Sequence, residues 1–264
     1  MNTFVPAQSY DPKLLKGSTL IIPTVSIANV PQLTIDLYVN SLKLERVGFF
    51  DEPSVMPVAG IFEFAPEKGI LVAFEVYQTE DRKFTFVQQR TPILKGKRQT
   101  LLANLESFIS TYEFSKILII TSTDASRRVD VQMTGVPFRL LASPDSNVAK
   151  RALEINLPPY EKLPEEEHQL PHHPESEAEM DIPYLHGSGV ARKLYGRLVS
   201  KYDVSMLIMF ALEGDNIQDS VEYAKCIDAV LGVVDVARAV DFKWTYPASW
   251  DWVFGPPLNP ALYD

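Results

Sequence analysis

The chain has 264 residues, of which 46% are hydrophobic and 22% are charged, a composition typical of a globular protein with a sizeable core. Its formal net charge of -9 and its lack of a basic stripe exclude a nucleic-acid footprint, and no apolar run approaches the length of a membrane span. The single cysteine, Cys226, excludes an intrachain disulfide and favours a reducing compartment. The N-terminus lacks a signal-peptide core, so we expect a cytoplasmic or nuclear protein with no membrane or nucleic-acid partner.

Predicted strands and helices alternate along most of the chain. Apolar, β-branched runs predict strands at residues 19–23, 46–50, 117–120 and 204–210, and a hairpin from 69–77 and 83–88. Helical spacing of apolar residues predicts a helix that begins at Asn29 and others at 99–112, 190–199 and 216–231. This alternation predicts an α/β protein with one domain over residues 1–264, in which helices cover a mixed, largely parallel sheet.

The first predicted helix has a recognisable start. Asn29 can cap it, Pro31 suits the first turn, and Gln32 stands three residues after Asn29, as in a capping box.

Residues 157–188 differ in character from the rest of the chain. Six prolines interrupt the region from Leu157 to Gly189, and eight acids stand against one base between Glu161 and Asp181. The composition predicts a mobile acidic insertion, whose charge would suit a basic partner surface. It also holds His168, His172 and His173, but nothing fixes ligand geometry there, so a solvated loop is favoured over a metal site.

Two short polar segments are the candidates for an enzyme site. Gly187-Ser188-Gly189 precedes a helix and could cradle a phosphate, although it lacks the Walker lysine and the dinucleotide fingerprint. Residues 121–124, Thr-Ser-Thr-Asp, follow a buried strand where α/β enzymes place their active sites. The simpler interpretation is a helix cap at Ser188 and a polar strand end. We therefore expect no catalytic, cofactor or metal site, with a nucleoside- or phosphate-handling enzyme as the alternative.

Aromatic residues are unusually dense near the C-terminus, at Trp244, Tyr246, Trp250, Trp252 and Phe254. They can pack the chain end onto the domain, and they can also form a protein-binding surface, because Trp and Tyr are good interface anchors. Cys226, by contrast, is interpreted as a small hydrophobic residue on the helix at 216–231.

The last residues, about 256–264, predict an extended tail that docks as a unit. Pro256, Pro257 and Pro260 stiffen it, which reduces the entropy lost on docking. Leu262 and Tyr263 can then fill a pocket while the terminal carboxylate of Asp264 pairs with a lysine or a backbone nest.

Several motifs occur in a fixed order along nearly the whole chain, apart from 51–69 and the acidic insertion. They are residues 21–36, the Gln-Gln-Arg-Thr-Pro of 88–92, the Pro-Phe-Arg of 137–139, the Glu-Gly-Asp-Asn of 213–216 and residues 247–255. Together they resemble the proteasome assembly chaperone family. The terminal Leu-Tyr-Asp is similar to the hydrophobic-tyrosine-any tails of fungal members.

The resemblance implies a chaperone without enzymatic activity and a three-layer α/β/α domain similar to nucleoside phosphorylases. It implies a heterodimer with a sister chaperone, which binds the outer face of the proteasome α-ring and promotes core-particle assembly. The pair would block wrong ring dimers and premature binding of activators. Leu262 would be the apolar contact, Tyr263 the anchor and Asp264 the carrier of the carboxylate, which a lysine between neighbouring α-subunits receives.

Two points stay open in the sequence. The tail motif does not separate assembly from regulation of mature proteasomes, since activators use the same docking chemistry. Exposed parts of the helix that begins near Asn216 and the hairpin at 70–87 are the candidates for the heterodimer interface.

Overall fold

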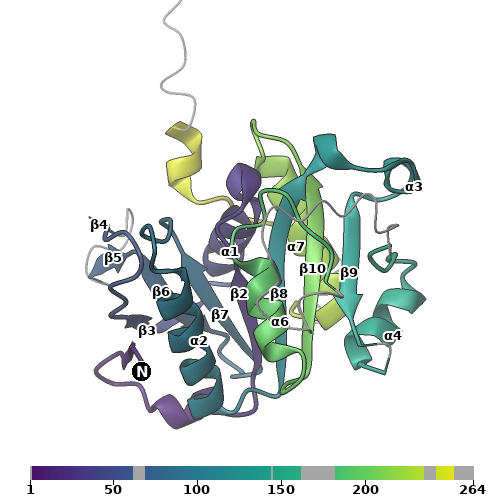
Figure 1. Ribbon diagram of the computed structural model, residues 1–264. Helices are drawn as coiled ribbons and strands as arrows, with labels where there is room; N and C mark the ends of the chain where they lie inside the picture. The colour runs from purple at the N-terminus through teal and green to yellow at the C-terminus, as the bar shows by residue number, and fades with distance from the viewer. Residues whose placement is uncertain (1, 62–68, 144, 162–181, 235–241, 253–264) are drawn as a thin grey trace, which may run out of the picture.

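The protein is built around one eight-stranded sheet (Figure 1). The computed structural model describes residues 2–61, 69–143, 145–161, 182–234 and 242–252. The strands lie in the order β1-β3-β6-β7-β2-β8-β10-β9, and their bounds are Phe4–Pro6 (β1), Thr19–Pro23 (β2), Glu45–Phe50 (β3), Phe74–Gln78 (β6), Phe84–Gln89 (β7), Lys116–Asp124 (β8), Phe138–Ala142 (β9) and Val204–Ala211 (β10). A separate two-stranded sheet pairs β4 (Ala59–Ile61) with β5 (Ile70–Val72).

The sheet is mixed, as predicted, and its parallel part is the centre. β7, β2, β8 and β10 run parallel to one another, whereas the pairings that involve β1, β3, β6 or β9 are antiparallel. The parallel share is thus smaller than the sequence led us to expect. Every residue of β10 is buried, which explains why its sequence is apolar apart from Ser205, because helices cover both of its faces.

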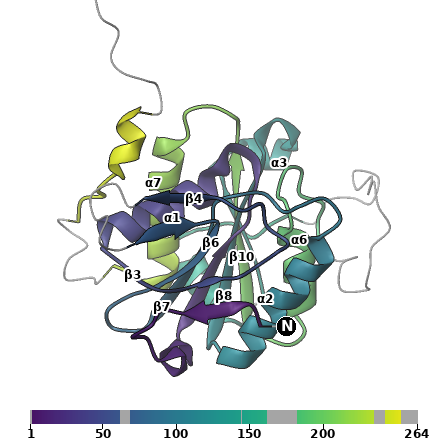
Figure 2. The same cartoon turned by 90° about the vertical axis from the view of Figure 1, so that its left-hand side faces the viewer.

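Helices form a layer on each face of the sheet, so the predicted three-layer arrangement is confirmed (Figure 2). One face carries α2 (Arg98–Tyr112) and α6 (Ala191–Leu198), and the other carries α1 (Val30–Ser41), α4 (Asn147–Glu154) and α7 (Ile217–Leu231). Each layer has its own hydrophobic cluster against the sheet. A further short helix is α3 (Asp130–Met133), and short 3-10 turns include η1 (Pro12–Leu15), η2 (Ile27–Asn29), η4 (Ala125–Arg127) and η6 (Ala248–Trp252).

The start of α1 differs from the prediction. Asn29 has a left-handed backbone (φ 51°) and its side chain makes no capping bond to the helix. Instead, the Gln32 amide donates to the Asn29 side-chain oxygen at 3.2 Å, so the expected capping box does not form. The preceding residue, Ala28, is also left-handed (φ 62°), which leaves no extended residue from which a cap can reach the first turn.

The described ends of the predicted mobile stretch pack against the domain. Leu157 and Leu185 are buried, and Tyr160 donates its amide to the carbonyl of Leu140 on β9 at 2.8 Å. Residues 162–181, with the three histidines, lie outside the described residues. Described residues at both ends of the predicted insertion thus contribute to the packed domain, and the single-domain organisation and the mobility of the insertion stay predictions.

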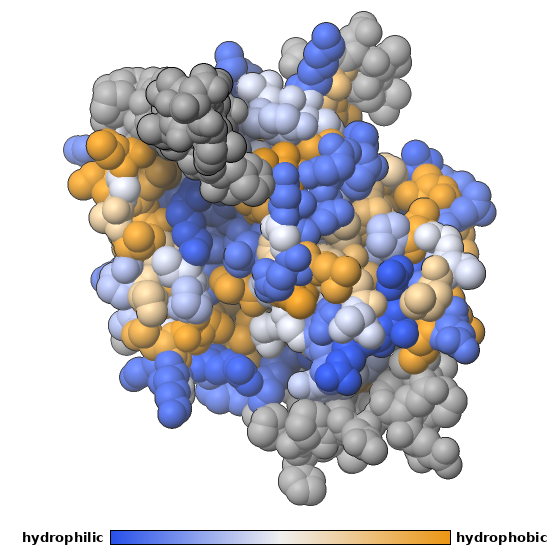
Figure 3. Space-filling view, turned by 90° about the horizontal axis from the view of Figure 1, so that it is seen from above, coloured by the Kyte–Doolittle hydropathy of each residue, from blue (hydrophilic) through white to orange (hydrophobic). Residues whose placement is uncertain are grey.

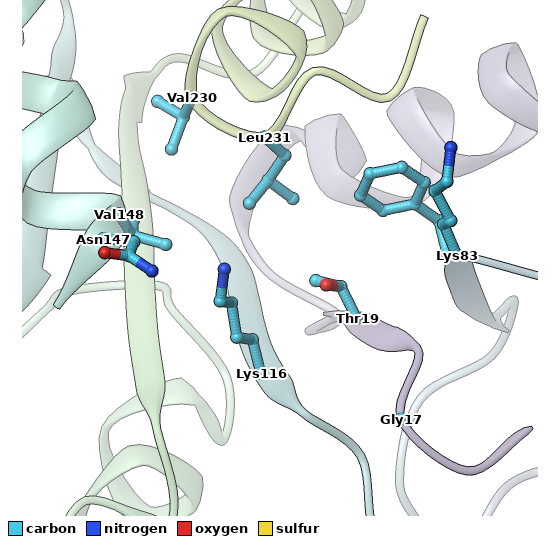
Figure 4. A pocket seen from close by; sticks show the side chains of 9 residues that line it. Gly17, Thr19, Lys83, Lys116, Asn147, Val148, Val230 and Leu231 are labelled. Carbon is cyan, nitrogen blue, oxygen red and sulfur yellow. The ribbon is translucent and has the colours of Figure 1, made fainter.

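The central parallel strands give the molecule two distinct edges. We call the side where β2, β7, β8 and β10 end the carboxyl edge; η2, η4, α3 and the connection from β10 to α7 lie there (Figure 1). The opposite side is the amino edge. It holds a pocket of about 290 Å³ in which the Lys116 side chain reaches toward Asn147 (Figure 4).

Candidate interaction surface

The predicted docking tail, Leu262, Tyr263 and Asp264, lies outside the described residues, as does Phe254. The last described element is η6, which ends at Trp252. In Figures 1 and 2, η6 lies at the top of the molecule, on the side of the carboxyl edge. The chain therefore passes toward its C-terminus from this side.

The aromatic segment before the tail packs largely onto α1. The Trp244 ring meets Tyr38 edge to face, with ring centroids 5.1 Å apart, and Trp250 is buried. The Asn40 amide donates to the Thr245 carbonyl at 2.7 Å, which fixes the backbone of the segment. Packing onto the domain is thus confirmed for both tryptophans, and the partner-binding role of the five aromatic residues stays a prediction.

Tyr246 is the described aromatic residue of this segment that remains open to solvent. Its side chain is 46% exposed and stacks on Trp250 with ring centroids 5.7 Å apart. Stacking holds the ring in place at low entropic cost, which suits a contact residue.

Two motif segments that are far apart in sequence meet in an ion network. Arg90, after β7, donates to both carboxylate oxygens of Asp36 on α1, at 2.8 and 3.0 Å. The same guanidinium lies 3.3 Å from Glu75, which is fully buried and also pairs with Arg46 at 3.0 Å. Tyr77 donates to Glu75 at 3.0 Å; burial, and next the Glu75 charge, raise the Tyr77 pKa, so the hydroxyl keeps its proton.

This network also positions the two-stranded sheet. The Val72 amide donates to Glu75 at 3.3 Å, and Arg46 donates to the Ile70 carbonyl, so both ends of β5 are tied to the main sheet. A two-stranded sheet is marginal alone, so these bonds are needed to hold β4 and β5. Sequence reasoning missed Glu75, although a carboxylate inside the apolar run 69–77 was a signal for a buried ion pair.

A second set of bonds between distant segments holds the connection from β2 to α1. The Ser122 hydroxyl on β8 donates to the Ile27 carbonyl, and the Ser122 amide donates to Ser26 at 3.1 Å. The Glu213 carboxylate, from the connection after β10, accepts the Ala28 amide at 3.2 Å. Left-handed backbone at a residue with a side chain costs about 1–2 kcal/mol, and these bonds hold it in place.

The glycines of Gly187-Ser188-Gly189 serve a close approach of two loops. A Cβ on Gly189 would lie 2.2 Å from the Val25 carbonyl oxygen, and one on Gly187 would lie 3.0 Å from Ile27. The Ser188 hydroxyl donates to the Leu185 carbonyl and makes no cap on α6, which corrects the expected cap. These close contacts, with the bond from the Ser188 amide to the Leu185 carbonyl at 3.3 Å, give the segment a structural role.

The residues at 121–124 lie within β8, which continues to Asp124, instead of after its end. Thr121, Ser122 and Thr123 are buried, and their hydroxyls bond to Thr24, Ser26, Ile27 and the carbonyls of His186 and Ser188. Asp124 accepts from the amide and hydroxyl of Ser126 and so begins η4. These bonds give a structural role to each residue that the enzyme alternative required.

Among the described residues no group of three or more His, Cys, Asp or Glu side chains could hold a metal ion. Cys226 is half-buried against the α7 side of the core, and burial raises its pKa to about 12. Of the helices that the structure describes, none is long and apolar enough to cross a membrane.

The structure shows which parts of the two suggested heterodimer surfaces are exposed to solvent. The strands β6 and β7 of the hairpin are almost wholly buried inside the main sheet, and only β5 exposes a large apolar side chain, Ile70. The described part of α7 exposes polar residues such as Gln218 and Lys225. Sequence reasoning also passed over Val131 and Met133, which are exposed on α3.

The Pro-Phe-Arg motif ends at a buried arginine. Arg139 on β9 is 2% exposed, and its guanidinium lies 2.6 Å from the carboxylate of Glu161. Gln132 on α3 donates to the other oxygen of Glu161 at 3.1 Å. This ion pair fixes the first residues of the predicted insertion to the sheet edge.

Comparisons with known proteins agree with this arrangement. The family model for the PAC2 family matches residues 20–210. Proteasome assembly chaperone 2 of Homo sapiens is 29% identical over 271 residues, which cover 98% of this chain and all of the relative. The protein of the same name from Danio rerio is 31% identical (94% and 95% covered), and that from Nematostella vectensis is 35% identical (83% and 91% covered).

Solved structures show the same fold at low sequence identity. Pyrococcus furiosus PbaA, an archaeal homologue of proteasome-assembly chaperone, superposes with a TM-score of 0.59 at 8% identity, covering 85% of this chain and 86% of that one. Pyrococcus furiosus PbaB, an archaeal proteasome activator, gives a TM-score of 0.57 at 12% identity, with 90% and 92% covered. The likeness to nucleoside phosphorylases stays a prediction.

The family model matches residues 20–210, and the relatives match over nearly the full length of the chain. The chain therefore belongs to the PAC2 family.

Proposed function

We propose that this chain is a proteasome assembly chaperone that acts by protein binding and not by catalysis. The observation that carries the proposal is the match to chaperones of this name over 94–98% of the chain. The buried hydroxyls of β8 support it, because Thr121 and Ser122 already bond internally to Thr24, Ser188 and Ile27.

The chain pairs with a related sister chaperone, and the heterodimer binds the outer face of the proteasome α-ring. Leu262 and Tyr263 enter a pocket between neighbouring α-subunits, and the terminal carboxylate of Asp264 pairs with a lysine there. Occupancy of these pockets promotes ring and core-particle assembly, and it blocks wrong ring dimers and early activator binding. The protein works in the cytoplasm and the nucleus.

The test is affinity purification of the tagged chain from its native cells, followed by native gels and mass spectrometry. We expect a sister chain, α-subunits and incompletely processed core particles in the bound material. Deleting residues 262–264 should remove the α-subunits while the sister chain and the folded domain stay. Recovery of mature particles alone would instead indicate a regulator of finished proteasomes.

A matched pair of tyrosine variants separates the tail from general aromatic contacts. Tyr263→Ala should weaken ring binding by about a hundredfold, the loss of one interface anchor worth about 2–3 kcal/mol. Tyr246→Ala removes an exposed ring of the described domain and should leave the tail contact in place. Equal ring binding by the wild type and by Tyr263→Ala would overturn the assigned role of the tail.

A further inference from the structure

Exposed large hydrophobic residues concentrate at the carboxyl edge. At least nine of the fourteen such residues in the described part of the chain lie there. They form two groups. The β4–β5 patch contains Met56, Val58, Ile61, Ile70 and Leu94, and the α3 patch contains Val131, Met133, Val136 and Leu212.

Both patches are held by bonds to the main sheet. In the β4–β5 patch, Ile61 and Ile70 are cross-strand partners, 69% and 59% exposed, on the small sheet that Glu75 and Arg46 tie down. In the α3 patch, the Phe210 amide donates to the Pro137 carbonyl at 2.8 Å, which joins the segment after α3 to the end of β10. A surface fixed in this way loses little entropy when a partner covers it.

Figure 3 looks down on the carboxyl edge and shows hydrophobic areas at its left and right sides and a smaller one near the centre, with hydrophilic residues between them. The left side is where Figure 1 places β4 and β5, and the right side is where it places η4 and α3. Glu213 and Asp215, both exposed, belong to the connection from β10 to α7 on the same edge. Apolar areas divided by charged ones are typical of an interface that forms and dissociates, and permanent interfaces are larger and more continuous.

The occupant is inferred from where the described chain ends. The tail starts after Trp252 on the carboxyl-edge side, and the twelve residues from 253 to 264 span at most about 40 Å when extended. A partner that holds the terminal carboxylate is therefore within reach of this edge. A partner from which a chaperone must later be released fits the divided apolar surface better than a permanent sister chain does.

We propose that the carboxyl edge is a second docking surface for the outer face of the proteasome α-ring, in which the β4–β5 patch and the α3 patch contact the ring while the tail is anchored in it. This inference rests on the proposed function, because it takes the α-ring as the tail's partner. It assigns the ring contact to described residues in addition to the last three of the chain.

The test uses the full chain with its sister chain and compares three double variants. Ile61→Ser with Ile70→Ser removes the centre of the β4–β5 patch, and Val131→Ser with Met133→Ser removes that of the α3 patch. The control, Leu14→Ser with Leu153→Ser, truncates residues that are 44% and 71% exposed and lie outside both patches. All six positions are exposed, so thermal unfolding should show a folded domain in each variant.

Binding of purified α-rings is then titrated, and sister-chain pairing is measured separately by co-purification. We expect each patch variant to bind rings about tenfold more weakly with pairing intact, and the control to bind as the wild type does. Ring binding at wild-type strength by both patch variants would overturn the inference. So would loss of sister-chain pairing in place of ring binding, which would assign the patches to the heterodimer.

Failure of the proposed function and failure of the second docking surface give different results. If the wild-type pair does not bind α-rings, the proposed function is wrong. If the wild type binds and the patch variants bind equally well, the function stands and only the second docking surface is lost.

Discussion

The two edges of the sheet differ in what fills them and in what they leave exposed. At the carboxyl edge, loops from η2, β8 and the Gly187–Gly189 segment are in van der Waals contact and share hydroxyl bonds, while apolar side chains point outward. At the amino edge, Lys116 and Asn147 line an open pocket beside Val230 and Leu231 (Figure 4).

We therefore expect substitutions to be tolerated less well at the closely packed carboxyl edge than at the open amino edge. The motif residues Asp36, Arg90 and Glu213 all bond near the carboxyl edge: Arg90 pairs with Asp36, and Glu213 accepts the Ala28 amide and so fixes the backbone there. A docking surface needs such support, because small displacements of apolar contacts reduce complementarity. Variants at the two edges should therefore have unequal effects on stability.

The largest effect is expected at Glu75, at the start of β6. Glu75→Ala leaves Arg46 and Arg90 without their shared buried carboxylate and should lower the free energy of unfolding by about 3 kcal/mol. Urea unfolding measures the loss. The control is Glu154→Ala, which breaks an exposed pair with Arg151 and should cost under about 1 kcal/mol. Equal losses in the two variants would show that the buried network does not support this edge.

Two glycines with the same backbone conformation give the most direct comparison of the edges. Gly189 (φ 64°) faces the Val25 carbonyl at the carboxyl edge, whereas Gly232 (φ 65°), after α7 at the amino edge, has open space around its Cα. Gly232→Ala should cost about 1 kcal/mol for the left-handed backbone alone. Gly189→Ala should cost about 2 kcal/mol more, because the added methyl group forces the two loops apart. The melting temperatures of the two variants decide the point, and a difference near zero would contradict close packing of the loops.

A smaller effect is expected from the buried hydroxyls. Thr121→Val keeps the shape of the side chain but removes the acceptor of the Thr24 hydroxyl and the donor to the Ser188 carbonyl. The loss should be about 1–2 kcal/mol in urea unfolding, since Thr24 can still reach Ser188. Thr111→Val, at an exposed bond on α2, is the control and should change stability by less than about 0.5 kcal/mol. A neutral Thr121→Val would mean that the hydroxyl contributes nothing to this edge.

Local patterns predicted most of the core elements from sequence. The spacing of apolar residues located α2, α6 and α7 to within one or two residues, and the run at 204–210 located β10, because burial dictates those positions. The strand β9 escaped, since its buried Arg139 interrupts the apolar pattern and is satisfied only by Glu161 from a distant segment. Burial of a charge depends on a partner that one-dimensional spacing does not reveal.

For the candidate site too, composition predicted some of the residues, whereas others became apparent only from the fold. Composition singled out Trp244, Tyr246 and Trp250, but only the fold shows that Tyr246 is the exposed one. Likewise, Gly189 stood out as a loop glycine. The group that requires a glycine there, the Val25 carbonyl, lies on another loop 164 residues earlier. The apolar patches were missed because isolated Val or Met residues in a polar stretch carry no periodic signal, and the fold alone gathers them at one edge.

The last and smallest effect concerns Cys226 on α7, the helix that spans from the carboxyl edge to the amino edge. Burial raises the thiol pKa to about 12, so the reactive thiolate is scarce at neutral pH, and a thiol reagent should react with it at least about a hundredfold more slowly than with a free thiol. The control is Leu153→Cys combined with Cys226→Ala, which presents an exposed thiol and should react at the free rate.

Because the thiol pKa of Cys226 is higher in the folded chain than in the unfolded chain, ionisation of the unfolded chain lowers stability only above the ordinary thiol pKa. Cys226→Ala should remove that loss of stability at alkaline pH. Fast labelling of native Cys226 at neutral pH would mean that α7 opens locally, and the amino edge would then be dynamic as well as open.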